Sequence, residues 1–143
     1  MKALIIEDEK PAANRLIRLL DNYDPGITIL GVLDSVEDSV AWFKNNEMPD
    51  LVFLDIHLAD GYSFEIFNQV DITAPIIFTT AYDNYALKAF EVNSVDYLLK
   101  PIDEEKLKRS IDKLKRLREG ESSITSEDIV TLIDTFNKKT KYD

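Results

Sequence analysis

The chain has 143 residues, 45% of them hydrophobic, and a formal net charge of -10, so it can bury one core and we expect one main folded domain. The absence of cysteine excludes disulfides and cysteine-bound metals, and the acidic charge disfavours nonspecific binding to nucleic acid. No apolar segment is long enough to cross a bilayer and no secretory signal begins the chain, so we expect a cytoplasmic protein without membrane contact.

Short β-branched apolar runs alternate with stretches of helical periodicity, a pattern typical of a parallel sheet with helices on both faces. We predict strands at residues 3–6, 28–33, 51–54, 76–79 and 96–99. Helices are predicted from Pro11 to the turn at 24–26, at residues 36–46, 63–69 and 84–92, and from Asp103 through Leu117. The first of these helices should place Ala13, Leu16, Ile17 and Leu20 on one face, and Asp103 should be the N-cap of the last. Together these units predict a small doubly wound α/β domain.

Acidic residues stand at the ends of two predicted strands. Glu7 and Asp8 follow the first strand directly, and Asp55 follows the third. Because the functional crevice of such sheets lies beyond the carboxyl ends of the strands, we expect these three carboxylates to lie together. Clustered carboxylates raise one another's pKa, so keeping them ionised calls for a cation, and oxygen ligands without Cys or His suit Mg²⁺.

Two further polar residues stand at the ends of the last two strands. Thr80 follows the fourth strand and offers a hydroxyl donor, and Lys100 follows the fifth and offers a positive charge. The set is suited to a phosphoryl group, with Asp55 as the candidate nucleophile. Each residue alone also has an ordinary interpretation, as a helix cap, a strand-end residue or a solvated charge. Their joint occurrence at the same end of four strands favours a site.

At these positions the chain resembles the receiver domain of bacterial two-component response regulators. The matching residues are Glu7-Asp8 (acidic pair), Asp55 (phosphoacceptor), Thr80-Ala81 (switch hydroxyl and small neighbour), Tyr97 (switch aromatic) and Lys100-Pro101 (lysine and cis-proline). The match covers residues 1–118. It implies a flavodoxin-like, CheY-like (βα)5 sandwich of three layers with a parallel five-stranded sheet in the order 2-1-3-4-5.

The resemblance also implies roles for these residues. Asp8, Asp55 and the backbone carbonyl of His57 would ligate Mg²⁺, with Glu7 acting through water. A sensor histidine kinase would supply the phosphoryl group, and Thr80 and Tyr97 would switch the conformation. The protein would be a signalling phosphoacceptor rather than an enzyme. Glu7 stands where the commoner pair has Asp, and Ala59 stands where many receivers have Pro. Neither difference changes the nucleophile, so phosphorylation is still expected.

Residues 80–101 are similar to receivers of the LytR/AlgR class, whose output is a LytTR-type DNA-binding domain. We expect that domain to be missing from these 143 residues, because only one long helix and a tail are predicted after Pro101. Residues 119–143 are predicted to be a linker followed by a short amphipathic stretch. We therefore expect contact with DNA only through the missing domain, and a homodimer on activation through either the face of the fourth helix or the tail. A tail packed on its own domain is the alternative.

Other functional classes fit the sequence less well. A phosphatase of the haloacid dehalogenase type would carry a second Asp where His57 stands, and a nucleotide-binding module would need a glycine-rich loop where residues 7–10 stand. A pseudo-receiver that binds partners without being phosphorylated is disfavoured by the joint presence of the site residues. His57 receives no catalytic role, because its side chain should point away from Asp55 or into solvent.

Overall fold

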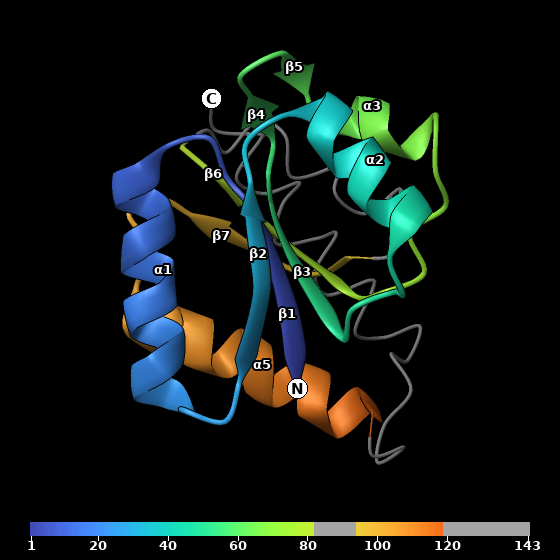
Figure 1. Cartoon of the computed structure of the whole chain (residues 1–143). Coiled ribbons are helices and arrows are strands. Elements are labelled where there is room, and N and C mark those ends of the chain that lie inside the picture. Colours follow the sequence, from blue (N-terminus) through green and yellow to red (C-terminus); the bar gives the residue numbers. More distant parts are fainter. Residues whose placement is uncertain (82–93, 119–143) are drawn as a thin grey trace, which may run out of the picture.

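The computed structural model describes residues 1–81 and 94–118 (Figure 1). In this part of the chain, a five-stranded parallel sheet runs in the order β2-β1-β3-β6-β7. Its strands are β1 (Lys2–Ile6), β2 (Thr28–Leu33), β3 (Leu51–Asp55), β6 (Ile76–Thr80) and β7 (Ser94–Leu99). Since β6 and β7 correspond to the fourth and fifth predicted strands, the predicted order 2-1-3-4-5 is confirmed.

Helices cover both faces of the sheet, which gives the predicted three layers (Figure 1). On one face lie α1 (Lys10–Tyr23) and α5 (Glu104–Arg118), and on the other lie α2 (Val36–Asn45) and α3 (Phe64–Phe67). Alternate residues of β1 point into these two cores: Ala3 and Ile5 pack beneath α1 and α5, whereas Leu4 and Ile6 pack beneath α2 and α3.

The central strand β3 is buried along its whole length, as expected for a continuous apolar run covered on both faces. Its neighbour β1 is buried at every residue except Lys2. The edge strand β2 instead alternates exposed and half-buried residues. The carboxyl ends of β1 and β3 therefore stand on a buried, close-packed part of the sheet.

The predicted elements are present with small differences at their ends. The bounds of β2 match the prediction, and β1 and β7 begin slightly earlier than predicted. Strand β3 extends one residue further, to Asp55, and β6 extends one residue further, to Thr80. Helix α3 is shorter than the predicted span of residues 63–69. The helix predicted at residues 84–92 and the tail at 119–143 lie outside the described residues, so they stay predictions.

Local signals for the helix ends are confirmed where they can be seen. Pro11 lies in the first turn of α1. The backbone N–H of Lys106 donates to Asp103 Oδ2 at 3.0 Å, so Asp103 caps α5 as predicted. The buried face of α1 contains the predicted Ala13, Leu16 and Leu20, together with Leu19, while Ile17 is only partly buried.

One element was not predicted. A short antiparallel hairpin of β4 (His57–Leu58) and β5 (Gly61–Tyr62) follows β3 directly. Gly61 adopts a φ of 143°, in the region that favours glycine. The hairpin closes where the backbone N–H of Ser63 donates to the carbonyl of Ile56 at 2.8 Å. It lies at the same end of the sheet as the predicted site (Figure 1).

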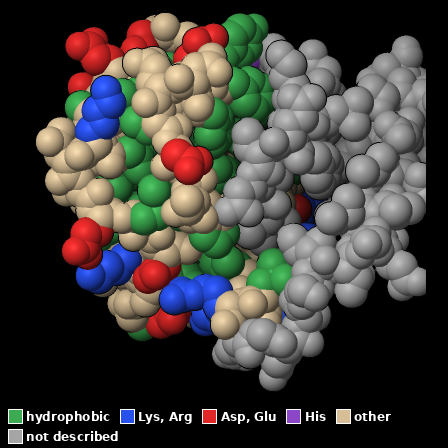
Figure 2. Space-filling model, turned by 90° about the vertical axis from the view of Figure 1, so that its right-hand side faces the viewer, with side chains coloured by type: hydrophobic (Ala, Val, Ile, Leu, Met, Phe, Trp, Pro, Cys, Tyr) green, Lys and Arg blue, Asp and Glu red, His purple; other side chains and the backbone are tan. Residues whose placement is uncertain are grey.

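The surface is mixed in character. Figure 2 shows acidic and basic side chains interspersed with apolar ones on the side of the molecule that carries α2 and α3, among the residues that the structure describes. Within the same residues, no helix combines the length and the apolar character that a membrane span requires.

Candidate functional site

The register of the sheet brings the predicted site residues to one edge. Asp55, the last residue of β3, is paired with Thr79 of β6, and Thr80 is paired with Leu99 of β7. The backbone N–H of Lys100 then donates to the carbonyl of Thr80 at 2.7 Å, which continues the ladder beyond β7. The strand ends therefore hold Asp55, Thr80 and Lys100 on adjacent strands.

Glu7 and Asp8 follow β1, the strand on the other side of β3. One carboxylate oxygen from each of Glu7, Asp8 and Asp55 lies within 4.8 Å of the other two. Glu7 and Asp55 are 6% and 5% exposed, whereas Asp8 is exposed to solvent. The predicted cluster of three carboxylates is therefore present, with two buried members and one open to water.

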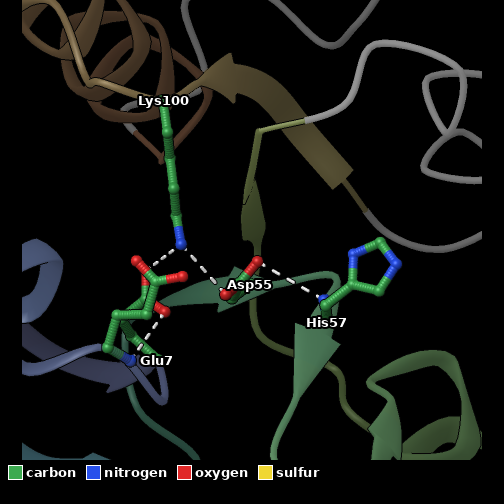
Figure 3. A network of polar contacts seen from close by, with 5 residues as sticks. Glu7, Asp55, His57 and Lys100 are labelled. Carbon is green, nitrogen blue, oxygen red and sulfur yellow. Dashed lines mark hydrogen bonds and ion pairs between the residues drawn. The ribbon is translucent and has the colours of Figure 1, made fainter.

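Lys100 lies against this cluster (Figure 3). Its Nζ atom is 3.0 Å from Asp55 Oδ2 and also forms an ion pair with Glu7 Oε1. Three carboxylates and one ammonium leave a formal charge of -2 when all four groups are ionised, because three negative charges meet one positive charge. A hard divalent cation with oxygen ligands would neutralise that charge, so the residues present fit Mg²⁺.

The pKa values of the cluster reflect this crowding. Burial raises the pKa of Glu7 above its usual value, and Asp55 adds to the rise while Lys100 opposes it. Burial also raises the pKa of Asp8, with a contribution from Glu7. Burial lowers the pKa of Lys100, but hydrogen bonds and charges from Glu7 and Asp55 outweigh burial and raise it overall. The lysine is therefore held in its charged form beside Asp55.

The side chain of His57 takes no part in this cluster. Figure 3 shows its ring turned away from Asp55, as predicted. The ring instead packs against Tyr62 across the hairpin, with ring centroids 4.8 Å apart. The backbone N–H of His57 donates to Asp55 Oδ1 at 3.4 Å, so the main chain of this residue is what approaches the acid. Ligation by its carbonyl stays a prediction.

The two predicted switch residues lie on neighbouring strands. Thr80 is fully buried at the end of β6. Tyr97 on β7 is paired with Phe78 of β6, is half-buried, and packs against the core beneath α2 and α3. The Lys100-Pro101 peptide bond is cis, as predicted. These positions agree with the predicted roles, while the switching motion itself stays a prediction.

The hairpin also brings a residue to the site region that the sequence reasoning missed. Asp60, at the hairpin turn, accepts hydrogen bonds from the backbone N–H groups of Val36 at 2.6 Å and Glu37 at 3.1 Å. These hydrogen bonds lower the pKa of Asp60, the one from Val36 most, although burial opposes the shift. The Asp60-Gly61 dipeptide is a turn signal that could have indicated the hairpin, but not its partner helix.

Residues 3–112 match the protein family described as "Response regulator receiver domain". The sensory transduction protein LytT of Bacillus anthracis is 40% identical over 130 residues, which cover 89% of this chain and 52% of that protein. LytT of Enterococcus faecalis is 41% identical over 119 residues, which cover 81% of this chain and 48% of that protein. These relatives agree with the predicted LytR/AlgR class. The chain spans about half the length of both.

Solved structures agree with the fold. The response regulatory domain of protein mrkE from Klebsiella pneumoniae superposes with a TM-score of 0.73 at 30% identity, over 84% of this chain and 99% of that one. A two-component response regulator from Clostridium difficile superposes with a TM-score of 0.67, also at 30% identity, over 81% of this chain and 96% of that one. The flavodoxin-like, CheY-like arrangement expected from the sequence is thus shared with known receivers.

Proposed function

The chain belongs to the family of response regulator receiver domains, and we propose that Asp55 is its phosphoacceptor, which takes a phosphoryl group from a sensor histidine kinase. The observation that carries this proposal is the setting of Asp55: a buried carboxylate with the Lys100 ammonium at 3.0 Å and two further carboxylates within 4.8 Å. Such a group is placed to attack phosphorus while its surroundings offset the charge that gathers there.

Each residue of the site would have its own role in the transfer of the phosphoryl group. An oxygen of the Asp55 carboxylate bonds to phosphorus as the P–N bond of the donor's phosphohistidine breaks, and the electron pair of that bond stays on the imidazole. Lys100 stabilises the added negative charge from its place beside Asp55. Asp8, Asp55 and the His57 carbonyl would hold Mg²⁺, with Glu7 acting through water. Bound there, Mg²⁺ would neutralise charge shared by the carboxylates and the phosphoryl oxygens.

The phosphorylated state would be read through Thr80 and Tyr97. Phosphorylation adds roughly two negative charges and three strong acceptors beside the end of β6. The hydroxyl of Thr80 can donate to one of these acceptors, and its movement leaves room toward β7 for the ring of Tyr97. A phosphoryl group would bias this two-state element rather than create it. The changed face near β7 and α5 would then promote a homodimer.

The output we propose is transcriptional. The relatives named LytT are about twice as long as the matched segment, so the chain would act on DNA only through a LytTR-type domain outside these residues. The chain would itself be no enzyme acting on a separate substrate: its chemistry would be the gain and loss of its own phosphoryl group. The cytoplasm, where a histidine kinase presents its phosphohistidine, is the compartment that this role requires.

Acetyl phosphate with Mg²⁺ tests the proposal. Intact-mass spectrometry should show one phosphoryl group on the wild type and none on Asp55→Asn, which keeps the shape of the side chain without the nucleophilic charge. A wild type that gains no phosphoryl group, with Mg²⁺ and fresh donor, would favour the alternative of an unphosphorylated pseudo-receiver. Equal gain by both proteins would place the acceptor elsewhere.

A further inference from the structure

The hairpin that follows Asp55 is joined to the first turn of α2. At its tip, the two oxygens of Asp60 accept hydrogen bonds from the N–H groups of Val36 and Glu37, at 2.6 and 3.1 Å. Beside it, the N–H of Ala59 donates to the carbonyl of Asp34 at 3.3 Å. Two hydrogen bonds therefore connect a hairpin of two-residue strands to the ten-residue helix α2, and a third connects it to Asp34 in the loop that precedes the helix.

Asp60 shares the capping of α2 with Ser35. The Ser35 hydroxyl accepts the N–H of Asp38 at 3.0 Å, so the first three free N–H groups of the helix are all satisfied, two by Asp60 and one by Ser35. The negative charge of Asp60 also lies at the positive end of the helix dipole. Of these two capping residues, Asp60 joins α2 to the hairpin, whereas Ser35 belongs to the loop that enters α2.

The same loop reaches the other half of the acidic cluster. The backbone N–H of Glu7 donates to the carbonyl of Leu33 at 2.8 Å, and Leu33 immediately precedes Asp34 and Ser35. The segment from Leu33 to Glu37 therefore contacts Glu7 on one side and the hairpin on the other. It connects the loop that carries Glu7 and Asp8 to the hairpin that carries His57.

The hairpin needs such support. An isolated pair of very short strands is marginally stable in water, and its own pairing involves only His57 with Tyr62 and Leu58 with Gly61. Leu58 is buried and the N–H of Ser63 closes the base of the hairpin, but the tip, where Asp60 is exposed, has the contacts with α2. A loosened tip would let the main chain of His57 move relative to Asp55.

We propose that Asp60 is a positioning residue for the phosphoacceptor site: by holding the 57–62 hairpin on the N-terminus of α2, it sets where the His57 carbonyl stands relative to Glu7, Asp8 and Asp55. This inference rests on the proposed Mg²⁺-dependent function. It assigns to Asp60 no contact with the ion or the phosphoryl group. Its effect passes through the main chain of His57, so removal should weaken the binding of Mg²⁺ without removing a ligand.

The experiment compares Mg²⁺ affinity, measured by isothermal titration calorimetry, across matched variants of the whole chain. Asp60→Ala should weaken binding by about tenfold, the lower part of the range seen when groups that orient metal ligands are removed. Asp60→Asn, which keeps one acceptor oxygen, should fall between Asp60→Ala and the wild type. If Asp60→Ala does not fold, the Mg²⁺ affinity of Asp60→Asn alone tests the proposal, and it should be weaker than that of the wild type.

Two controls separate positioning from other effects. Ser35→Ala damages the cap of α2 but leaves the hairpin contacts, and Glu37→Gln removes an exposed negative charge next to the same contacts without removing the N–H that Asp60 accepts. Both should bind Mg²⁺ as the wild type does. Hydrogen exchange should also show faster exchange at the Val36 and Glu37 amides in Asp60→Ala.

The outcomes are distinguishable. Unchanged Mg²⁺ affinity in Asp60→Ala would overturn the positioning role and leave the proposed function standing. Equal weakening in Ser35→Ala or in Glu37→Gln would also overturn it, because helix stability or net charge would then account for the effect. A folded wild type that binds no Mg²⁺ would overturn the proposed function, and the positioning role with it.

Discussion

Lys100, which follows β7, forms an ion pair with Asp55 at the end of β3, with Lys100 Nζ 3.0 Å from Asp55 Oδ2, although β6 lies between these two strands. The same ammonium also pairs with Glu7, so one positive charge serves two buried carboxylates. This arrangement leaves the cluster short of positive charge and makes Lys100 important in two opposite ways. In the proposed function, it would compete with a bound cation for the carboxylates, and it would stabilise an added phosphoryl group.

Lys100→Ala should therefore separate the two effects. Without the ammonium, the formal charge of the cluster changes from -2 to -3, so Mg²⁺ affinity should rise. The rate of phosphorylation by acetyl phosphate at saturating Mg²⁺ should fall by about 100-fold, the usual effect of removing one group that stabilises transition-state charge. Calorimetry measures the affinity, and intact-mass time courses measure the rate.

The control for Lys100→Ala is Lys115→Ala. Lys115 is a surface lysine of α5 whose ion pair with Asp24 spans 3.9 Å, so its loss should change neither quantity. Equal rates in Lys100→Ala and the wild type would show that the ammonium beside Asp55 has no part in the transfer.

Thr80→Ala should uncouple phosphorylation from the switch. The variant keeps Asp55 and Lys100, so it should still gain one phosphoryl group. It lacks the hydroxyl that would donate a hydrogen bond to the phosphoryl group. The NMR signals of isotope-labelled Tyr97 should therefore no longer shift on addition of beryllofluoride and Mg²⁺. Thr80→Ser retains the hydroxyl and should restore the shift. A full Tyr97 response in Thr80→Ala would argue against this route.

The Asp60 cap predicts a pH-dependent stability. The pKa of Asp60 is lowered in the folded state from a usual value of 3.8, so the stabilisation is fully present above that value and is lost as the pH falls through the folded pKa. Asp60→Asn should thus be less stable than the wild type at pH 7, and the difference should shrink below pH 3.8. Urea denaturation across this range measures it, and a constant difference would contradict the ionic cap.

Core packing beneath α5 gives a test of the fold. Ile111 is completely buried between α5 and the sheet, and Ile111→Ala should lower the free energy of unfolding by about 3 kcal/mol through lost burial and a residual cavity. Lys108→Ala, on the exposed side of the same helix, should change it by less than about 0.5 kcal/mol. Chemical denaturation distinguishes the two. Similar losses in both variants would mean that α5 does not pack as described.

The sequence predicted most of what depends on local pattern. The apolar runs ending at Asp55 and before Lys100 predicted strands. Because parallel strands end at the same side of a sheet, these strands also predicted that Glu7, Asp8 and Asp55 lie together, as they do. Asp103 was predicted as a cap because its role depends on residues within one helical turn.

The hairpin and the exact length of α3 could not be predicted in this way. Their geometry depends on contacts between distant segments, such as the bond from Val36 to Asp60, which joins residues 24 positions apart. The residues of the hairpin have no periodic apolar pattern that would signal strands of two residues. The pairing of Lys100 with Glu7 as well as Asp55 likewise follows from side-chain reach in the folded state.

The central claim is that Asp55 carries the phosphoryl group, and the most direct test is to locate the modified residue. Borohydride reduces an aspartyl phosphate to homoserine, which peptide mass spectrometry identifies by position. After treatment with acetyl phosphate and Mg²⁺, we expect homoserine at position 55 in the wild type and nowhere in a sample treated without the donor. Homoserine at another acidic position, or none in a protein that still binds Mg²⁺, would contradict the claim.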